Sequence, residues 1–324
     1  MSDMGAEEMP SSGVTRASDG GAPAGTPSAG PTAGPSASGS GAPAGQDPAG
    51  RSGTGSGPGV VPPPSDTRFG EQGGVLTYGS YLRLDGLLAQ QSLQSDPPAH
   101  DELLFITIHQ VYELWFQQLL HELGDARDRM LAQDAYTPRV RLERCHVILR
   151  VLIEQVDVLE TMTPQDFGTF RSVLAPASGF QSVQFRELEF LSGAKDPAFL
   201  RRFRGLTRDE HARLERRLAE PSLWDGFLAV LGQAGFDVST VESRTAALYA
   251  VAYDRQRYGT LWDLAEALLE HDALCGRWRA RHVVMVERQI GIKSGTGGSS
   301  GASYLRSRVG LHYYPELWEL RNHL

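Results

Sequence analysis

The chain has 324 residues, a net charge of −8 at pH 7 and only two cysteines. An acidic chain offers no basic surface to a phosphate backbone, so no nucleic-acid partner is expected, and no stretch approaches the about 18 to 20 unbroken apolar residues of a membrane-spanning helix. Cys145 and Cys275 are too few for a disulfide framework, so a cytoplasmic location is expected.

Residues 1–74 are expected to form a disordered extension. They consist mostly of Gly, Ala, Pro and Ser, as in "GAPAGTPSAGPTAGPSASGSGAPAG". Such a run has few large side chains, so burial cannot offset the entropy that is lost when the chain becomes ordered. It has no basic segment followed by an apolar one, so no signal peptide is expected. Residues 75–324 have the size of one ordinary globular domain.

The remainder of the chain predicts an all-α fold. Apolar residues recur at helical spacing along almost all of it, and neither a convincing strand alternation nor an Asn-Gly or Asp-Gly hairpin turn occurs. "TPQD", which begins at Thr163, is typical of a helix start, with a Thr cap followed by Pro. Two long helices are expected to form the spine of a helix bundle. The predicted helices span residues 78–93, 101–133, 138–161, 164–174, 180–192, 196–203, 207–219, 221–233, 243–256, 258–290 and 314–322.

The segment "FITIHQVYELWFQQL" places a single histidine, His109, among aromatic and aliphatic residues. At about 100° per residue, Phe105, Tyr112 and Phe116 fall on one side of His109, whereas Glu113 belongs to a polar arc on the other side. Two interpretations remain open. His109 is either a buried histidine hydrogen-bonded to Glu113, or it lines a flat apolar pocket for a ligand.

His282 lies in "CGRWRARHVVMVERQIG", on a helix face that also carries Cys275, Trp278, Met285 and Gln289. A lone histidine on an apolar helix face is more often a structural residue than a ligand. A neutral imidazole presented from such a face is nevertheless what a haem iron requires. Spacing alone leaves both interpretations open.

Two further patterns give weaker signals. "ERCH", which ends at His146, is the only Glu-x-x-His pair in the predicted helices, whereas a di-iron bundle needs two such pairs and two further glutamates. A di-iron centre is therefore not expected, and His146 is expected on a helix surface. The glycine-rich "KSGTGGSSGASYL" lacks the Lys-Ser/Thr of a phosphate-binding loop. It is either an ordinary connector or a flexible loop that closes over a small polar ligand.

Five segments in chain order resemble the tryptophan 2,3-dioxygenase family, from about residue 75 to residue 320. They are "LTYGSYLRLDGLL", "HDELLFITIHQVYELWF", "LETMTPQDFGTFRSVLAPASGFQSVQFRELEF", "RHVVMVERQIG" and "KSGTGGSSGASYL". The resemblance implies an all-helical homotetramer that holds one non-covalent haem b in each subunit, ferrous in the active state. It also implies that O2 is inserted across the indole C2–C3 bond of L-tryptophan to give N-formylkynurenine, the first step of tryptophan catabolism through kynurenine.

The resemblance further implies the principal site residues. His282 matches the family's proximal ligand to the haem iron, and His109 matches the distal histidine that faces the indole nitrogen. Phe105 matches an aromatic residue that packs on the indole. Arg171 matches the arginine that pairs with the substrate carboxylate, and Thr296 matches the threonine of a loop that closes over the amino-acid end.

Other matched positions complete the implied site. Tyr78 and Tyr81 match residues that in this family complete the pocket of a neighbouring subunit, and Phe167 matches a further substrate-binding position. Ser178 and Gly179 match the distal loop near the haem edge. These roles are chemically coherent, since an arginine offers a planar fork to a carboxylate and one axial histidine leaves the opposite iron position open. Because the indole N–H is a very weak acid, the distal histidine is expected to orient the substrate rather than to remove its proton.

Two alternatives remain. Gln117 stands where the family commonly has lysine, and the segment "GFDVSTVESRTAAL" is shorter than in many relatives. These departures leave the exact substrate open. The long Gly/Ala/Pro/Ser extension and the Arg-rich, Lys-poor composition suggest a high-GC genome, in which such an enzyme could serve a natural-product pathway and oxygenate a modified tryptophan, such as a methyltryptophan, for example to an oxindole. A second alternative is a non-catalytic module that binds haem or tryptophan without consuming O2.

Overall fold

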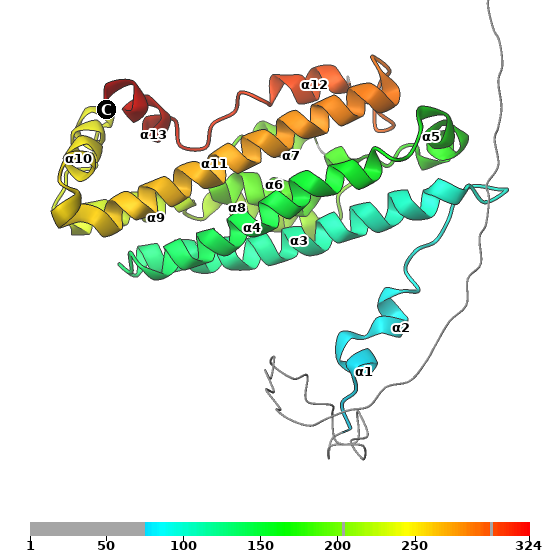
Figure 1. The fold of residues 1–324 in the computed structure, drawn as a ribbon, viewed down its shortest axis with the longest axis horizontal. Helices are drawn as coiled ribbons and strands as arrows, with labels where there is room; N and C mark the ends of the chain where they lie inside the picture. The colour runs from blue at the N-terminus through cyan, green and yellow to red at the C-terminus, as the bar shows by residue number, and fades with distance from the viewer. Residues whose placement is uncertain (1–74, 203–204, 299–300) are drawn as a thin grey trace, which may run out of the picture. The chain divides into compact units, whose positions relative to one another are not determined.

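The computed structural model describes residues 75–202, 205–298 and 301–324, which belong to the unit Gly70–Leu324 (Figure 1). Within these ranges the regular structure is entirely helical, which confirms the predicted all-α fold. The predicted disordered extension over residues 1–74 lies outside the described residues. Among the helices described, none combines the length and the apolar character that a membrane crossing requires.

Three long helices, rather than the two predicted, form the spine of the domain. Figure 1 shows α3 (His100–Leu131), α4 (Thr137–Leu159) and α11 (Arg255–Ile290) side by side. They meet through apolar residues at helical spacing, of which Leu123, Leu142 and Leu268 are completely buried. This core fixes the helices that carry His109 and His282, two of the cavity residues described below.

Shorter helices cover the spine. In chain order they are α5 (Pro164–Phe170), α6 (Val183–Ser192), α7 (Ala198–Arg202), α8 (Arg208–Ala219), α9 (Leu223–Gln233), α10 (Val241–Tyr253), α12 (Ala302–Ser307) and α13 (Pro315–Leu320). Figure 1 shows α10 and α13 together at one end of α11. Asp272 of α11 holds the C-terminal segment there, because its carboxylate accepts hydrogen bonds from the backbone N–H groups of Tyr313 and Tyr314 and from Trp318 Nε1.

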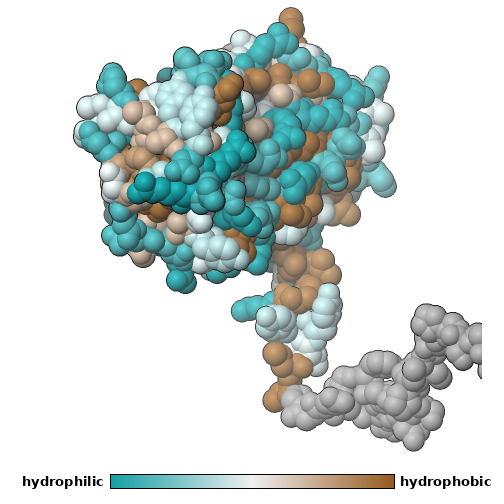
Figure 2. Space-filling model, turned by 60° about the vertical axis from the view of Figure 1, so that its left-hand side comes forward, coloured by the Kyte–Doolittle hydropathy of each residue, from teal (hydrophilic) through white to brown (hydrophobic). Residues whose placement is uncertain are grey.

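The predicted helix over residues 78–93 is wrong. The structure has two short helices, α1 (Tyr78–Leu82) and α2 (Leu84–Leu87), separated by Arg83 in the left-handed region at φ 51°. Neither helix buries a residue, and apolar side chains along this segment reach the surface (Figure 2). Apolar spacing alone cannot show this interruption, because it depends on the backbone conformation of one residue.

Several other boundaries differ from the prediction. The predicted helix over 164–174 ends at Phe170 and continues as a 3₁₀ turn, η1 (Arg171–Leu174), and the one over 180–192 divides into η2 (Gly179–Gln181) and α6. The sequence did not predict α12, and α11 begins at Arg255 with a kink at Tyr258. These differences matter for the site, since η1, η2 and α12 all contribute residues to it.

The predicted surface position of His146 is also wrong. The side chain is only 7% exposed, and its Nε2 lies 3.0 Å from the backbone oxygen of Ala267 on α11. His146 follows Leu142 by one turn and therefore shares the face of α4 that packs against α11. It is a core histidine that is satisfied by a backbone group.

Candidate active site

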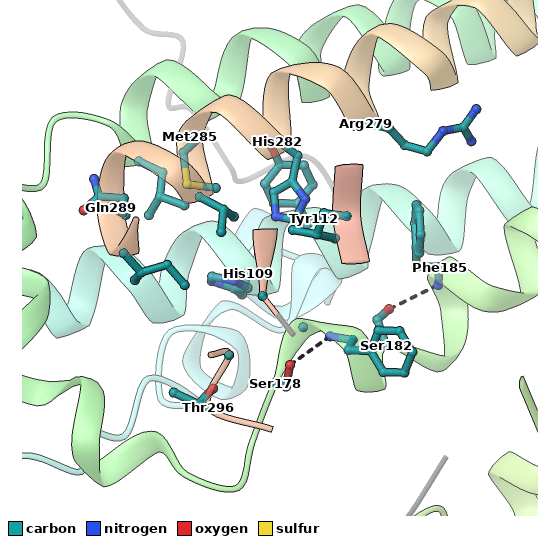
Figure 3. Close-up of a pocket in the computed structure, with 18 of the residues that line it drawn as sticks. His109, Tyr112, Ser178, Ser182, Phe185, Arg279, His282, Met285, Gln289 and Thr296 are labelled. Atoms are coloured by element: carbon teal, nitrogen blue, oxygen red, sulfur yellow. Dashed lines mark hydrogen bonds between the residues drawn. The ribbon is translucent and has the colours of Figure 1, made fainter. Parts of the chain in front are cut away.

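A cavity of about 290 Å³ lies between the spine helices and the loops that follow α4 and α11. Its lining combines aromatic and aliphatic side chains with polar and charged ones, which come from α6 and α11 as well as from the loops (Figure 3). Eight of the ten predicted site residues line it, namely Phe105, His109, Phe167, Arg171, Ser178, Gly179, Thr296 and His282. The fold therefore brings together residues from α3, α5, η1, η2, α11 and the glycine-rich loop.

His109 is held in one tautomer by its own helix. Its Nδ1 lies 2.7 Å from the carbonyl oxygen of Phe105, one turn earlier, so Nδ1–H donates and Nε2 keeps its lone pair. Burial lowers the pKa of His109, which favours the neutral ring. The predicted hydrogen bond to Glu113 is not present, because that carboxylate accepts instead from Gln184 Nε2 at 2.8 Å. Of the two open interpretations, the structure supports the cavity-lining histidine.

His282 lines the opposite side of the same cavity, and Figure 3 shows its ring across from that of His109. Burial, together with the proximity of His109, lowers the pKa of His282 to about 4. The ring stacks on Trp278, with 5.2 Å between ring centroids and 11° between planes. α11 thus presents a neutral imidazole to the cavity.

A cluster of phenylalanines forms the wall beside His109. The Phe105 ring lies 4.2 Å from the His109 ring and stacks on Phe167 at 5.5 Å, with 24° between the planes. Phe170 meets both rings edge-on, at 5.7 Å from Phe105 and 5.4 Å from Phe167. Since a stacked pair of rings presents a flat apolar surface, this wall suits a planar aromatic ligand.

The glycine-rich loop contacts the loop before η2. Arg171 donates a hydrogen bond to the Ser294 carbonyl, and the Thr296 hydroxyl donates to the Ala177 carbonyl at 2.6 Å. A Cβ atom at Gly297 would lie 2.6 Å from the Ser178 Cβ, so only glycine permits this approach. Of the two predicted alternatives for this segment, these contacts favour a loop that closes over the cavity.

Tyr78 and Tyr81 do not line the cavity of their own chain. Their relative exposures are 77% and 71%, and both belong to α1, none of whose residues is buried. The rings are therefore available to another molecule. The structure neither places them in a pocket nor contradicts the predicted role in a neighbouring subunit.

The sequence did not indicate a set of buried charged residues at the cavity. Arg186 and Glu189 of α6 are buried and form an ion pair with each other, and Glu189 also lies 4.0 Å from Arg308 Nη2. "FRELEF" resembles an ordinary surface pattern because charged residues alternate with apolar ones. Only the packing of α6 against both α3 and α8 shows that these charges lie inside.

The residues present fit a planar, iron-bearing cofactor such as haem. A neutral imidazole suits an axial iron ligand, and Met285 and Val286 extend the apolar wall around it. Arg308 also lines the cavity, and its Nε is buried with no hydrogen-bond partner among the described residues. An unpaired buried donor of this kind is rare, and a carboxylate of a bound group would satisfy it.

Fold and site together define a helical protein suited to hold a flat cofactor through one histidine, beside a pocket for an aromatic amino acid. The family model described as tryptophan 2,3-dioxygenase matches residues 65–235 and 231–324. The chain therefore belongs to the tryptophan 2,3-dioxygenase family, which confirms the resemblance seen in the sequence.

Individual relatives agree with this assignment. A protein from a Nocardioides species named tryptophan 2,3-dioxygenase is 66% identical over 260 residues, which cover 79% of this chain and 97% of that protein. A protein of the same name from Herpetosiphon aurantiacus is 48% identical over 257 residues, or 76% of this chain and 98% of that protein. One from Kineococcus radiotolerans is 42% identical over 262 residues, or 77% of this chain and 91% of that protein.

Proposed function

We propose that this chain is a haem-dependent dioxygenase that inserts both atoms of O2 across the indole C2–C3 bond of L-tryptophan to give N-formyl-L-kynurenine. The observation that carries this proposal is the pair of neutral imidazoles, His109 and His282, on opposite sides of an apolar cavity that Arg171 and Thr296 also line. None of the relatives named above carries a name that points to a modified tryptophan. The natural-product alternative is therefore not proposed.

His282 is the residue that would hold the iron of haem b. Its lowered pKa keeps the ring neutral at physiological pH, which leaves a nitrogen lone pair available for the metal. When bound, the haem supplies the oxygen chemistry, while the protein supplies binding, orientation and the exclusion of water. Ser178 and Gly179, in the loop against the cavity, would border the haem edge.

His109 would orient the indole. Because its Nδ1–H is committed to the Phe105 carbonyl, its Nε2 lone pair is the group free to accept a hydrogen bond from the indole N–H. A histidine with a lowered pKa is a weak base, and the indole N–H is a very weak acid. His109 therefore holds the substrate by a hydrogen bond rather than by removing its proton, and Phe105 and Phe167 pack on the ring.

Arg171 and the glycine-rich loop would recognise the amino-acid end of tryptophan. A guanidinium group binds a carboxylate through two parallel N–H donors, which fixes the orientation of the ligand as well as its charge. The contact between Arg171 and Ser294 joins this guanidinium to the loop. The Arg171 side chain can thus hold both the substrate carboxylate and the closed loop, and Thr296 would lie beside the ammonium group. Substrate binding would then exclude water from the cavity.

A homotetramer is part of the proposal. Val147, Val151 and Val158 are exposed apolar residues on one face of α4, which also carries the exposed Glu154, and Tyr78 and Tyr81 project from α1 without a partner surface among the described residues of their own chain. Exposed apolar surface of this kind is typical of protein interfaces. We infer that copies of the chain associate and that α1 completes a neighbour's pocket with its two tyrosines. The two free cysteines are consistent with a cytoplasmic location.

The direct test is turnover of L-tryptophan. Haem-loaded protein is reduced without oxygen, mixed with L-tryptophan and then exposed to O2. Formation of N-formylkynurenine, followed by its absorbance and confirmed by a mass equal to tryptophan plus two oxygen atoms, supports the proposal. Haem-loaded protein that binds tryptophan but forms no product would instead support the non-catalytic binding module.

A further inference from the structure

The rings of His109 and His282 are each held by a residue one helical turn earlier, but the two contacts differ in kind. His109 donates a hydrogen bond to the backbone carbonyl of Phe105 at 2.7 Å. His282 instead stacks on the side chain of Trp278, with 5.2 Å between centroids and 11° between planes. One ring is therefore oriented by a hydrogen bond and the other by an aromatic face.

The second ring lacks the usual support of a metal-binding histidine. Such histidines almost always donate their remaining ring N–H to a carboxylate, a backbone carbonyl or a water, which fixes both tautomer and rotation. Among the residues that the structure describes, none is hydrogen-bonded to the His282 ring, although His109 shows that a carbonyl one turn earlier can reach such a ring. Within the described protein, the rotation of His282 is therefore controlled by packing.

Trp278 is well placed to provide this control because other helices hold its indole. The ring of Phe185, from α6, lies 5.0 Å away, and those of Tyr112 and Phe116, from α3, lie at 6.2 and 6.5 Å in edge-on contact. The Tyr112 hydroxyl donates to the Leu152 carbonyl of α4 at 2.7 Å. The aromatic face under His282 is thus fixed by two helices besides its own, one of which is itself tied to α4.

We propose that Trp278 is a positioning residue that fixes the rotation of the His282 imidazole about its bond to the haem iron, in place of a hydrogen bond. The inference rests on the proposed function, in which His282 is the axial ligand. A stacked aromatic pair changes an equilibrium by about two- to tenfold beyond the area it buries, which is enough to favour one ring orientation. The residue acts through His282 and does not itself bind the iron.

The test compares two positions on the same helix. Trp278→Phe and Trp278→Leu are paired with Trp262→Phe and Trp262→Leu, since Trp262 also lies on α11 and is buried but does not line the cavity. The measurement is the iron–histidine stretching band of the ferrous, haem-loaded protein by resonance Raman spectroscopy. The band should broaden or move in Trp278→Leu, change less in Trp278→Phe, and stay as in the wild type in both Trp262 variants. Transfer of haem to an acceptor apoprotein should be about two- to tenfold faster from Trp278→Leu.

Two further outcomes decide the inference. An unchanged band in both Trp278 variants would overturn it, as would an equal change in the Trp262 variants, which would mark a general loss of packing. If Trp278→Leu does not fold, Trp278→Phe decides alone, because it keeps an aromatic ring in the core. His282→Ala separates this inference from the proposed function. If that variant keeps the band, the axial role itself fails, whereas loss of the band together with unchanged Trp278 variants removes only the role of Trp278.

Discussion

The Arg171 guanidinium donates a hydrogen bond to the backbone carbonyl of Ser294, which lies 123 residues later in the chain. The side chain expected to bind the substrate carboxylate is therefore also in contact with the loop expected to cover it. Replacing it by alanine should affect both functions without disturbing His282.

The first prediction is that Arg171→Ala weakens tryptophan binding. Truncating one partner of a hydrogen-bonded charge pair in a partly buried site costs about 2 to 5 kcal/mol, so the Kd should rise by at least tenfold. Titration of the haem-loaded protein with L-tryptophan, followed by its absorption spectrum, measures this. Arg171→Lys keeps the charge but loses the fork, and should lie between alanine and wild type. An unchanged Kd in the alanine variant would remove Arg171 from the substrate site.

The second prediction concerns the close approach of Gly297 to Ser178. Gly297→Ala places a Cβ 2.6 Å from the Ser178 Cβ and should push the two loops apart, which raises KM. Adding Ser178→Gly removes the clash and should restore part of the lost affinity. Gly310→Ala is a matched control, because its added Cβ would meet nothing within 4 Å. Equal KM values for Gly297→Ala and the control would show that this contact does not govern closure.

The third prediction is a dependence of stability on pH that arises from His271. Burial lowers the pKa of this histidine to about 3, while the unfolded chain keeps an ordinary value near 6.5. Above pH 6.5 neither state is protonated. As the pH falls from about 6.5 toward 3, His271 becomes protonated in the unfolded state but stays neutral in the folded state. The free energy of unfolding therefore falls by on the order of 1 kcal/mol per pH unit.

Urea unfolding of the haem-free chain at a series of pH values measures this slope. His271→Leu should flatten it, whereas the same change at the exposed His121 serves as the control. The folded environment of His271 has little to stabilise a charge, since Ser192 Oγ lies 3.0 Å from Nε2 and Nδ1 has no partner among the described residues. A slope that His271→Leu leaves unaltered would contradict this origin of the acid sensitivity.

The fourth prediction tests whether a neighbouring subunit completes the pocket. Tyr81→Ala and His282→Ala should each be inactive alone, because under the proposed function one loses a pocket residue and the other the iron ligand. In a mixed oligomer, a Tyr81→Ala chain can receive the intact Tyr81 of its His282→Ala neighbour, so activity should reappear. Co-expression with two affinity tags isolates such mixed oligomers. Inactive mixed oligomers of confirmed composition would show that α1 serves only its own chain or none.

The sequence predicted the long helices well because their apolar residues repeat over many turns, as in α3, α4 and α11. It failed where a single backbone conformation decides the outcome, as at Arg83, whose left-handed φ divides the predicted N-terminal helix. It also misplaced His146, because spacing shows which residues share a face but not which neighbouring helix covers that face. Short elements such as α12 are too brief to show a period.

The candidate site could be found from the sequence mainly because its residues lie in motifs that resemble a known family. Without that resemblance, His109 and His282 each had two open interpretations, since spacing cannot show what a ring faces. The structure shows that the two rings lie on opposite sides of one cavity. It also shows that a hydrogen bond to the Phe105 carbonyl sets the tautomer of His109. The sequence could not show that Arg186 and Glu189 are buried, because charged residues give the same sequence pattern whether they are buried or exposed.

The absorption spectrum of the purified chain, titrated with hemin and then with L-tryptophan, tests the axial role of His282 most directly. We expect saturation at one haem per chain, a Soret band that shifts when L-tryptophan is added, and loss of the bound spectrum in His282→Ala. A correctly folded chain that leaves hemin with its free spectrum, or a His282→Ala variant with the wild-type spectrum, would contradict that role.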